Sequence, residues 1–252
     1  MDDINFYDDY YNKFDHKLSS REQRRIYKTI SLIPNDVNTV LEVGCGDGRL
    51  INPLIGKYKK VCGLDISKKA LEHVEAIKVR GRIENLPFED NSFDIVLCCE
   101  VLEHLPISIY KKSIKEIERV AKKYIIVSVP NNEDIEISKI RCPYCGCNFH
   151  PHRHLRSYDD YNLKKLFPNF KTKYSDVILN DQKKYPKILI TIYKLLKRTD
   201  FPEMALCPQC GYFNKVSTEI NHKKGLRSLS KLLNPFISNK NGGWLVFLYE
   251  KK

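Results

Sequence analysis

The chain has 252 residues and a formal net charge of +12. This length suffices for a substantial core, either in one domain with an insertion or in two closely joined units. No apolar run approaches the ~20 residues of a membrane-spanning helix, and the acidic, tyrosine-rich start differs from a secretory signal, so we expect a cytoplasmic protein without a membrane span.

Charge is distributed unevenly along the chain. Residues 1–140 contain 22 Lys+Arg and 23 Asp+Glu, whereas residues 141–252 contain 21 and 8. The basic second part is expected to face an anionic partner, such as a phosphorylated or nucleotide-linked small molecule, an acidic glycan or RNA. A solvated lysine-rich surface would have the same composition, so both interpretations stay open.

The first 35 residues combine tyrosines with a helical pattern. The pattern covers Arg21–Ile33 and ends at Pro34, because proline cannot continue a helix. Tyr7, Tyr10 and Tyr11 precede it. They are candidates either to cover a ligand or to pack against the edge of a sheet.

The run Val40–Gly48 joins an apolar strand, an acid and a glycine-rich turn. It places Glu42 in the strand and then Gly44, Gly46 and Gly48 in a G-x-G-x-G spacing. Glycine tolerates positive φ and lets the backbone approach a ligand closely. Dinucleotide loops read G-x-G-x-x-G and phosphate loops end in G-K-[ST], so this spacing argues against a diphosphate ligand.

Strands and helices are expected to alternate along most of the chain, which predicts a parallel sheet with crossover helices. Asp65 ends the second expected strand about twenty residues after the glycine-rich turn, where an acid of a doubly wound sheet reaches a ribose diol. We expect strands near residues 38–43, 60–65, 77–80, 93–98, 124–129, 170–179 and 243–249, and helices near residues 47–58, 67–76, 108–122 and 185–198.

Several segments, in this order, resemble the class I S-adenosylmethionine (SAM) methyltransferases. They are Val40–Gly48, Lys60–Ser67 and the stretch Gly81–Leu105, which would hold the adenine loop, the fourth strand and the segment after it. The resemblance covers residues 36–131. It implies an α/β fold with a doubly wound, mostly parallel, seven-stranded Rossmann-like sheet, completed by an antiparallel final hairpin, and SAM as the cofactor.

The resemblance also assigns cofactor-binding roles. Glu42 and the backbone of residues 44–46 would hold the methionine end, Asp65 would accept hydrogen bonds from both ribose hydroxyls, and Ile66 would lie against the adenine. The implied cofactor-binding residues are Glu42, Gly44, Cys45, Gly46, Asp65, Ile66, Ile83, Glu84, Cys99 and Tyr11.

One position departs from the family pattern. Related sequences often read Gly-Asp-Ala-Glu where this chain reads Gly81–Glu84, with Arg82 in place of the carboxylate that faces the adenine amino group. Arginine has donors only and cannot accept that hydrogen bond. Glu84 and nearby backbone carbonyls are the candidates to replace it.

The segment Glu100–His104 follows the fourth strand, beside the expected position of the transferable methyl group. Methyl transfer requires an aligned nucleophile that loses its proton, and His104 is a candidate base for a hydroxyl because the unperturbed pKa of histidine is ~6.5. The segment is also frequent in the family as a helix start, where the histidine would only be hydrogen-bonded. The catalytic candidates are His104, Glu100 and Glu103.

The E-x-x-E-H pattern also resembles the divalent-metal segment of certain metal-dependent O-methyltransferases. That resemblance implies a second metal, held by two carboxylates, an imidazole and a histidine after the fifth strand. Such an ion would polarise the acceptor and lower its pKa. The implied ligands are Glu100, Glu103, His104 and His154, with His150 and His152 as alternatives to the last.

Two matching C-P-x-C-G knuckles predict a zinc site. Cys142 and Cys145 form the first, and Cys207 and Cys210 the second. Four thiolates fill the tetrahedral sphere of a structural Zn²⁺ and leave no open position for catalysis. The alternative is two unrelated redox or buried C-x-x-C turns. Other side chains near the first knuckle that are candidates to add to the ribbon are Cys147, His150 and His152.

The remaining cysteines sit in apolar strand or loop positions and are expected to behave as small hydrophobic side chains. They are Cys45, Cys62, Cys98 and Cys99. The expected domains are an N-terminal helical lid (1–35), a SAM-binding core (36–140), the first knuckle (141–157), a helix and the sixth strand (158–180), a basic insertion with the second knuckle (181–240) and the final strand (241–252).

These features predict a SAM-dependent methyltransferase with a zinc-ribbon insertion, acting on oxygen. The first knuckle with the later run His154–Tyr158 is similar to methyltransferases of surface-glycan pathways, which implies a small anionic, phosphorylated or nucleotide-linked sugar precursor as acceptor. An RNA methyltransferase is the alternative; Cys98–Glu100 lacks the Asn-Pro-Pro-Tyr pattern of amino-group base methylation. A non-catalytic zinc-bearing interaction subunit is the second alternative. The sequence leaves the oligomeric state open.

Overall fold

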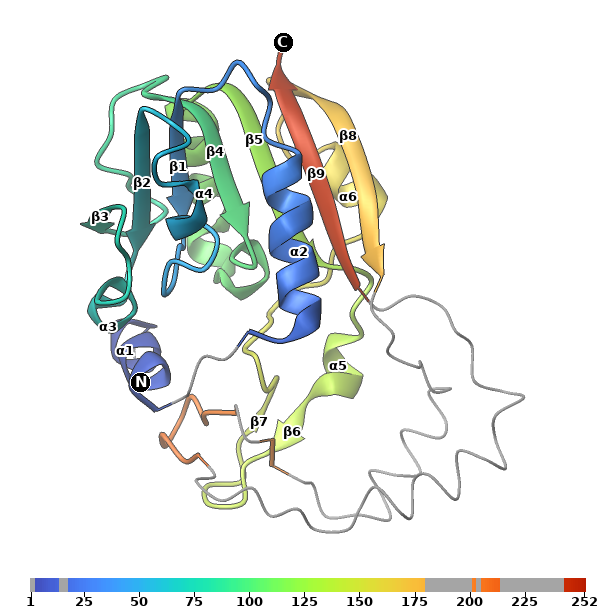
Figure 1. The fold of residues 1–252 in the computed structure, drawn as a ribbon. Coiled ribbons are helices and arrows are strands. Elements are labelled where there is room, and N and C mark those ends of the chain that lie inside the picture. Colours follow the sequence, from blue (N-terminus) through green and yellow to red (C-terminus); the bar gives the residue numbers. More distant parts are fainter. Residues whose placement is uncertain (1–2, 14–17, 180–200, 203–204, 214–242) are drawn as a thin grey trace. The chain divides into compact units, whose positions relative to one another are not determined.

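The computed structural model describes residues 3–13, 18–179, 201–202, 205–213 and 243–252 (Figure 1). The chain divides into two compact units. The larger unit contains residues 2–133, 155–178 and 243–252, and the smaller unit contains residues 134–154 and 179–242. Among the described residues, no helix has both the length and the apolar character needed to cross a membrane.

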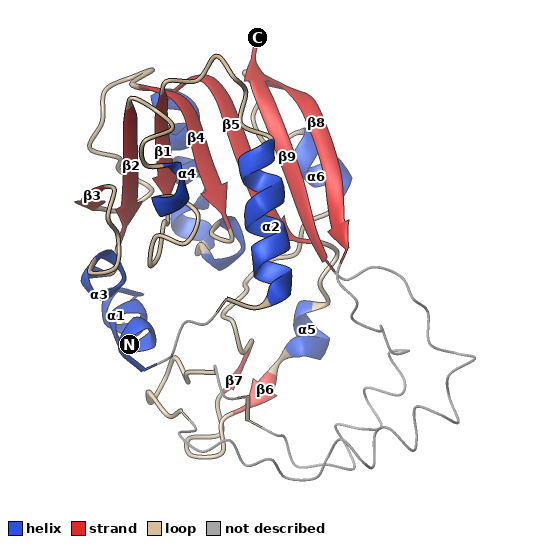
Figure 2. Ribbon diagram, viewed as in Figure 1, coloured by secondary structure: helices blue, strands red, loops and turns tan. Residues whose placement is uncertain are grey.

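The larger unit is built on a seven-stranded sheet with the order β3-β2-β1-β4-β5-β9-β8 (Figure 2). The pairs β1–β2, β1–β4, β2–β3 and β4–β5 are parallel, and β9 is antiparallel to β5. This confirms the predicted mostly parallel, seven-stranded Rossmann-like sheet. The strands are β1 (Thr39–Val43), β2 (Lys60–Asp65), β3 (Ile77–Arg80), β4 (Phe93–Cys99), β5 (Ala121–Pro130), β8 (Phe170–Leu179) and β9 (Gly243–Lys251).

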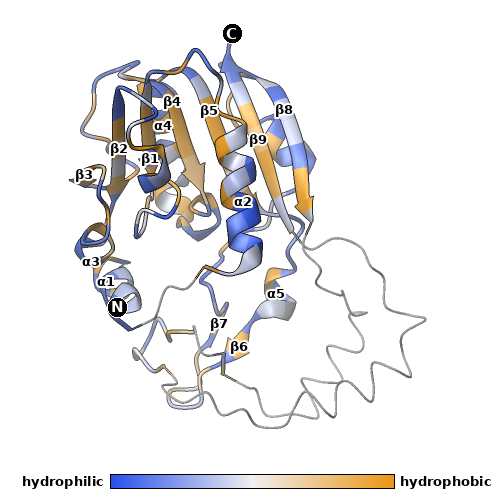
Figure 3. Ribbon diagram, viewed as in Figure 1, coloured by the Kyte–Doolittle hydropathy of each residue, from blue (hydrophilic) through white to orange (hydrophobic). Residues whose placement is uncertain are grey.

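Helices cover both faces of this sheet. Residues of α4 and α6 pack into one apolar cluster, and residues of α2 pack into the other. The central strands are strongly apolar, whereas α2 carries polar residues along its exposed side (Figure 3). The helices of this unit are α1 (Asp3–Lys13), α2 (Ser20–Ser31), α3 (Lys68–Leu71), α4 (Ile107–Val120) and α6 (Asp160–Lys164), with 3-10 turns η1 (Asn52–Leu54) and η2 (Leu102–His104).

Two expected helices differ from the structure. The helix expected over residues 47–58 is wrong: only η1 forms, because Pro53 interrupts the segment and Gly56 has a φ of 77°. The helix expected over residues 67–76 is shortened to α3. Asn52 binds the carbonyl of His73 and the N–H of Glu75 at 3.0 Å each, so these groups are engaged by a side chain. The expected helix at 185–198 lies outside the described residues.

The described part of the smaller unit contains α5 (Ile135–Ser138) and a two-stranded antiparallel sheet of β6 (Ile140–Arg141) and β7 (Asn148–Phe149). This hairpin carries the first C-P-x-C-G turn. A small apolar cluster that includes Phe149 and Ala205 packs beside the cysteines of both turns.

Candidate cofactor and acceptor site

The glycine-rich loop lies tightly between β2 and the segment after β4. The N–H groups of Gly44 and Cys45 both donate to the carbonyl of Leu64, at 2.7 and 3.0 Å. A Cβ on Gly44 would come within 2.4 Å of Val101 Cγ2, and one on Gly63 would come within 2.8 Å of Cys45 Sγ. Gly44 in the loop and Gly63 in β2 therefore allow the loop to pack this closely against its neighbours.

Asp65 ends β2 beside this loop. Its Oδ2 accepts the N–H of Gly46 and its Oδ1 accepts the N–H of Ser67, each at 2.8 Å. Burial raises the pKa of Asp65, while these backbone donors lower it, and the net shift is upward. Each carboxylate oxygen keeps a further lone pair, which suits a ribose diol. Ile66, the next residue, accepts a hydrogen bond from Arg80 through its carbonyl at 3.2 Å.

Glu42 of β1 is a buried carboxylate below the loop, with 3% of its surface exposed. Among the described residues, its buried Oε2 has no hydrogen-bond partner. Burial raises its pKa well above the usual value, and the positive charge of Arg25 opposes that shift only in part. A buried carboxylate oxygen without a donor is costly, so a ligand ammonium group would satisfy it.

Arg25 of α2 is a site residue that the sequence pattern did not single out. Within the described part of the chain, its buried Nε has no hydrogen-bond partner. Its guanidinium carbon lies 5.7 Å from the ring centre of Trp244. Burial would lower its pKa, but neighbouring acidic groups, Glu100 above all, give a net rise. In the sequence Arg25 is one of several arginines in the same helix, next to the buried Ile26. Nothing in that pattern distinguishes it from its neighbours.

The loop that is expected to contact the adenine follows β3. Ile83 is buried, and Arg82 Nε donates to Glu84 Oε1 at 2.6 Å. Arg82, which replaces the carboxylate of related sequences, therefore binds Glu84, the candidate to take over the hydrogen bond to the adenine amino group. Arg119 of α4 holds the rest of this loop through the carbonyls of Leu86, at 3.0 Å, and Phe88, at 2.7 Å.

The N-terminal helix α1 lies against the glycine-rich loop. A Cβ on Gly46 would come within 2.3 Å of the Tyr11 hydroxyl. Asp8 Oδ1 accepts hydrogen bonds from Ser67 Oγ at 2.6 Å and from the N–H of Lys69 at 3.1 Å. Burial raises the pKa of Tyr11 well above its usual value. The helix thus contacts both the loop and the start of α3.

Two further tyrosines of α1 lie in an aromatic group. Tyr10 stacks on Phe6, with ring centres 6.5 Å apart, and the ring of Tyr7 meets His104 edge-on, also at 6.5 Å. Contacts of α1 therefore extend from Ser67, two residues after the ribose-binding candidate Asp65, to His104 in the segment after β4.

Glu100 follows β4 with a left-handed backbone, φ 58°. Ser128 Oγ donates to its Oε1 at 3.1 Å, and Trp244 Nε1 donates to its Oε2 at 2.6 Å. Its backbone N–H also donates to the Ser128 carbonyl at 2.8 Å. Cys99, the preceding residue, is buried, and burial raises the pKa of its thiol above the usual range. Ser128 and Trp244 were missed by sequence reasoning.

Glu103 and His104 lie in η2. Glu103 is fully buried, and neither of its carboxylate oxygens has a hydrogen-bond partner among the described residues. Burial and the negative charge of Glu100 raise its pKa well above the usual value. His104 Nε2 lies 3.9 Å from Glu103 Oε1. His154 belongs to the smaller unit, so a four-ligand second metal site stays a prediction.

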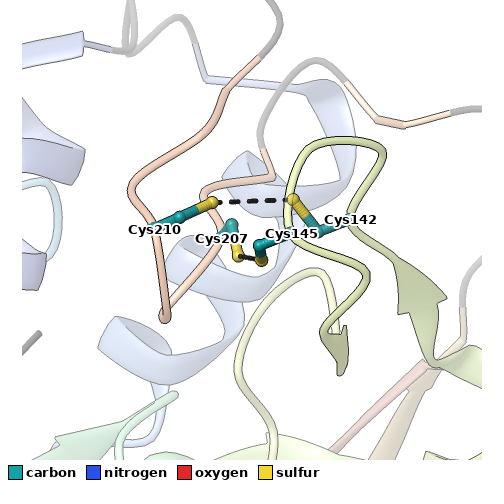
Figure 4. Close-up of side chains that lie close together, drawn as sticks. All are labelled: Cys142, Cys145, Cys207 and Cys210. Carbon is teal, nitrogen blue, oxygen red and sulfur yellow. Dashed lines mark hydrogen bonds between the residues drawn. The ribbon is translucent and has the colours of Figure 1, made fainter.

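The four knuckle cysteines come together in the smaller unit (Figure 4). The Sγ atoms of Cys142 and Cys210 are 3.7 Å apart, and those of Cys145 and Cys207 are 3.6 Å apart. With Zn–S bonds of about 2.3 Å, tetrahedral geometry places sulfur atoms about 3.8 Å apart. All four Sγ atoms lie within 4.8 Å of one another, so the set fits one zinc ion.

The two knuckles share one backbone pattern. Gly146 N–H donates to the Cys142 carbonyl at 3.0 Å, and Gly211 N–H donates to the Cys207 carbonyl at 2.9 Å. Both glycines have a left-handed φ, 74° and 71°. Cys147 contributes its carbonyl, which accepts the N–H of Cys142 at 2.8 Å.

Two of the histidines after the first knuckle, His150 and His154, stack on each other. The rings of His150 and His154 are 4.5 Å apart, and His150 Nδ1 accepts the backbone N–H groups of His152 and His154 at 3.3 and 3.2 Å. The Nδ1 of His150 is thereby engaged within its own loop.

Comparisons with known proteins agree with this architecture. Residues 41–127 match the family model described as a methyltransferase domain. An uncharacterised protein of Methanocaldococcus jannaschii is 39% identical over 100 residues, which cover 38% of this chain and 42% of that protein. A ubiquinone biosynthesis O-methyltransferase of Albidiferax ferrireducens is 33% identical over 86 residues, which cover 30% and 34%.

A solved structure matches over almost the whole chain. Magnesium protoporphyrin IX methyltransferase of Synechocystis, with bound S-adenosylhomocysteine (SAH), superposes with a TM-score of 0.57 at 13% identity, covering 99% of this chain and 98% of that one. At this identity the likeness concerns the fold, which is that of the class I methyltransferases. The chain spans about a third to two fifths of the length of the first curated relatives that it matches.

Proposed function

We propose that the chain is a SAM-dependent methyltransferase whose cofactor binds at the carboxyl ends of β1 and β2. The observation that carries this proposal is the joint placement of Gly46 and Asp65, hydrogen-bonded at 2.8 Å, beside a buried Glu42 with an unpartnered oxygen among the described residues. When bound, the cofactor supplies a methyl group on a positively charged sulfur.

Different residues of the chain bind different parts of the cofactor. Asp65 accepts hydrogen bonds from the ribose hydroxyls, and Ile66 and Ile83 contact the adenine. Glu42 accepts the methionine ammonium, and Arg25 donates to the methionine carboxylate, because a charged bidentate donor suits that group.

Calorimetric titration with SAM and SAH tests the proposal. We expect saturable binding by the folded wild-type protein and at least a tenfold loss of affinity in Asp65→Ala, since charged hydrogen bonds contribute about 1.5–3 kcal/mol each. Absence of binding by the folded protein would instead favour the non-catalytic interaction subunit.

The smaller unit is proposed to hold one structural zinc on Cys142, Cys145, Cys207 and Cys210. The sulfur spacing supports this proposal. With four thiolate ligands, the ion would hold the two knuckles together and take no part in methyl transfer.

The acceptor is proposed to be a small molecule methylated on oxygen. The ubiquinone biosynthesis O-methyltransferase among the relatives supports this class. The anionic envelope-glycan acceptor and the RNA alternative stay predictions. Transfer of label from methyl-labelled SAM into fractionated cell extract would identify the acceptor, and salt-insensitive or undetectable RNA binding would remove the RNA alternative.

A further inference from the structure

Glu100 is held from two neighbouring strands. Ser128 lies in β5 and Trp244 lies in β9, where Trp244 pairs with Pro130 in the antiparallel register. The hydroxyl of Ser128 and the indole N–H of Trp244 each donate to a different carboxylate oxygen of Glu100. The carboxylate therefore has both position and orientation fixed by side chains from outside its own segment.

The backbone of Glu100 adds to this observation. A φ of 58° is uncommon for a residue with a long side chain. Such conformations persist where surrounding contacts determine them, and they cluster at functional sites. Here the contacts are the three hydrogen bonds to Ser128 and Trp244.

Trp244 also links Glu100 to a cation. The guanidinium of Arg25 lies 5.7 Å from the centre of the indole ring, and Glu100 is the principal negative group acting on Arg25. The indole thus contacts the anion through its N–H and faces the cation with its ring. Replacing the indole by phenylalanine would remove the first contact and keep an aromatic ring for the second.

We propose that Trp244 and Ser128 are positioning residues that fix Glu100 as the hydrogen-bond acceptor for a hydroxyl of the methyl acceptor. This inference rests on the proposed methyltransferase function. A fixed carboxylate attracts an O–H donor and repels a phosphoryl oxygen. Given the proposed O-methylation, the methylated atom is then a hydroxyl oxygen, including in a substrate that carries phosphate elsewhere.

Methyl transfer to a hydroxyl releases a proton, and Glu100 is placed to accept it. The hydroxyl oxygen forms a bond to the methyl carbon, the carbon–sulfur bond breaks, and the sulfur keeps the bonding electron pair. The hydroxyl proton passes to the Glu100 carboxylate and then to water. General-base assistance of this kind requires the base to lie within hydrogen-bond reach of the proton, which is what a fixed carboxylate provides.

Tryptophan fluorescence tests the positioning without knowledge of the acceptor. The chain has one tryptophan, so the emission reports Trp244 alone. We expect Glu100→Gln and Ser128→Ala to change the emission, whereas Glu72→Gln, an exposed carboxylate on the turn after α3, leaves it unchanged. Emission in Glu100→Gln identical to that of the wild type would overturn the contact.

Trp244→Phe separates positioning from general stability. The matched control is Tyr249→Phe, which removes a buried hydroxyl donor to the Leu163 carbonyl from the same strand. We expect both variants to bind SAH as the wild type does. In Trp244→Phe, transfer of label from SAM to the cell-extract acceptor should fall ~10–100-fold, because small misplacements of a catalytic group cost this much. Equal transfer in Trp244→Phe and the control would overturn the proposal.

Other outcomes distinguish this inference from the proposed function. A wild-type protein that binds neither SAM nor SAH contradicts the methyltransferase and this inference with it, whereas normal binding with label on a phosphoryl oxygen overturns this inference alone. A change of Trp244 emission on addition of Mg²⁺, reversed by a chelator, would make Glu100 a metal ligand and would also overturn it.

Discussion

Arg25 is a partly buried cation close to several acidic groups of the candidate site. Among its neighbours, Glu100 raises the pKa of Arg25 most, and among the described residues the Nε of Arg25 has no hydrogen-bond partner. A buried donor without an acceptor costs free energy in the ligand-free protein, and a hydrogen bond to a ligand carboxylate would remove that cost.

We expect Arg25→Ala to weaken SAM binding ~10–100-fold, because a charge-assisted hydrogen bond contributes about 1.5–3 kcal/mol. Calorimetry measures this loss. Arg24→Ala, at the exposed neighbouring position, is the control. Equal losses in the two variants would show that charge on α2, and not a contact of Arg25, attracts the ligand.

Glu42 allows a prediction about pH. Its folded pKa is raised by burial, so the native state binds this proton more tightly than the unfolded chain, whose glutamates titrate near ~4.3. The stability that this provides is complete below that pH and is lost as pH rises toward the folded pKa.

Glu42→Gln should therefore raise the free energy of unfolding of the ligand-free protein relative to the wild type, increasingly so above about pH 4.3, while weakening SAM binding. Urea unfolding at several pH values measures the first effect. Glu89→Gln, at an exposed position in the loop after β3, should follow the wild-type curve. A Glu42→Gln curve parallel to it would contradict the prediction.

At the scale of elements, the Asp8 carboxylate attaches α1 to the start of α3. Burial would raise the pKa of Asp8, but hydrogen bonds from Ser67 and Lys69 bring it below its usual value. The carboxylate thus caps the start of α3 from another helix, next to Asp65.

Asp8→Asn should loosen α1 and raise the dissociation rate of SAM several-fold, since a partly exposed hydrogen bond of this kind contributes about 0.5–1.5 kcal/mol. Stopped-flow displacement measures the rate. Asp9→Asn provides the control, because Asp9 pairs with Lys13 within α1 at 2.8 Å. An unchanged rate in Asp8→Asn would show that α1 does not limit the dissociation of SAM.

The loop after β3 is held by a side chain of α4. Hydrogen bonds from Arg119 to Glu116 and Asp90 raise the pKa of the guanidinium, and the same group donates to two loop carbonyls. We expect Arg119→Ala to lower the free energy of unfolding by about 1–3 kcal/mol and Arg119→Lys to recover only part of it, because lysine lacks the planar fork. Thermal unfolding and hydrogen exchange of residues 82–90 measure this; full recovery by lysine would exclude the fork geometry as the cause.

Sequence patterns predicted these elements unevenly. Buried apolar runs located β1, β2, β4, β5 and β9 to within a few residues, because each run is short and bounded by turns. The largely exposed strands β3 and β8 were also predicted within those limits. The helix expected after the glycine-rich loop failed at Pro53 and Gly56, and α3 was shortened by the Asn52 side chain. Trp244 and Glu100 are 144 residues apart in the chain, so no local pattern could have joined them.

At the scale of the whole molecule, the four cysteines join two distant parts of the smaller unit. Cys145 and Cys207 are 62 residues apart. A zinc ion shared between them would couple metal binding to the folding of that unit.

We expect one zinc per purified chain, measured by elemental analysis, and loss of that zinc with lowered thermal stability in Cys142→Ser. Cys147→Ser should retain the metal, since the Cys147 sulfur is not part of the group of four Sγ atoms. Full zinc content in Cys142→Ser would remove the four-cysteine assignment.

The position of β9 has a consequence for how the chain reaches its native state. This strand is last of the seven in sequence but lies between β5 and β8. Until it inserts, β5 exposes an unpaired edge and β8 has no neighbour on that side, and pairings between such distant segments form slowly. A nascent chain would therefore wait with an open, apolar edge that is prone to association with other chains, and dependence on chaperones during synthesis should be greatest in that interval.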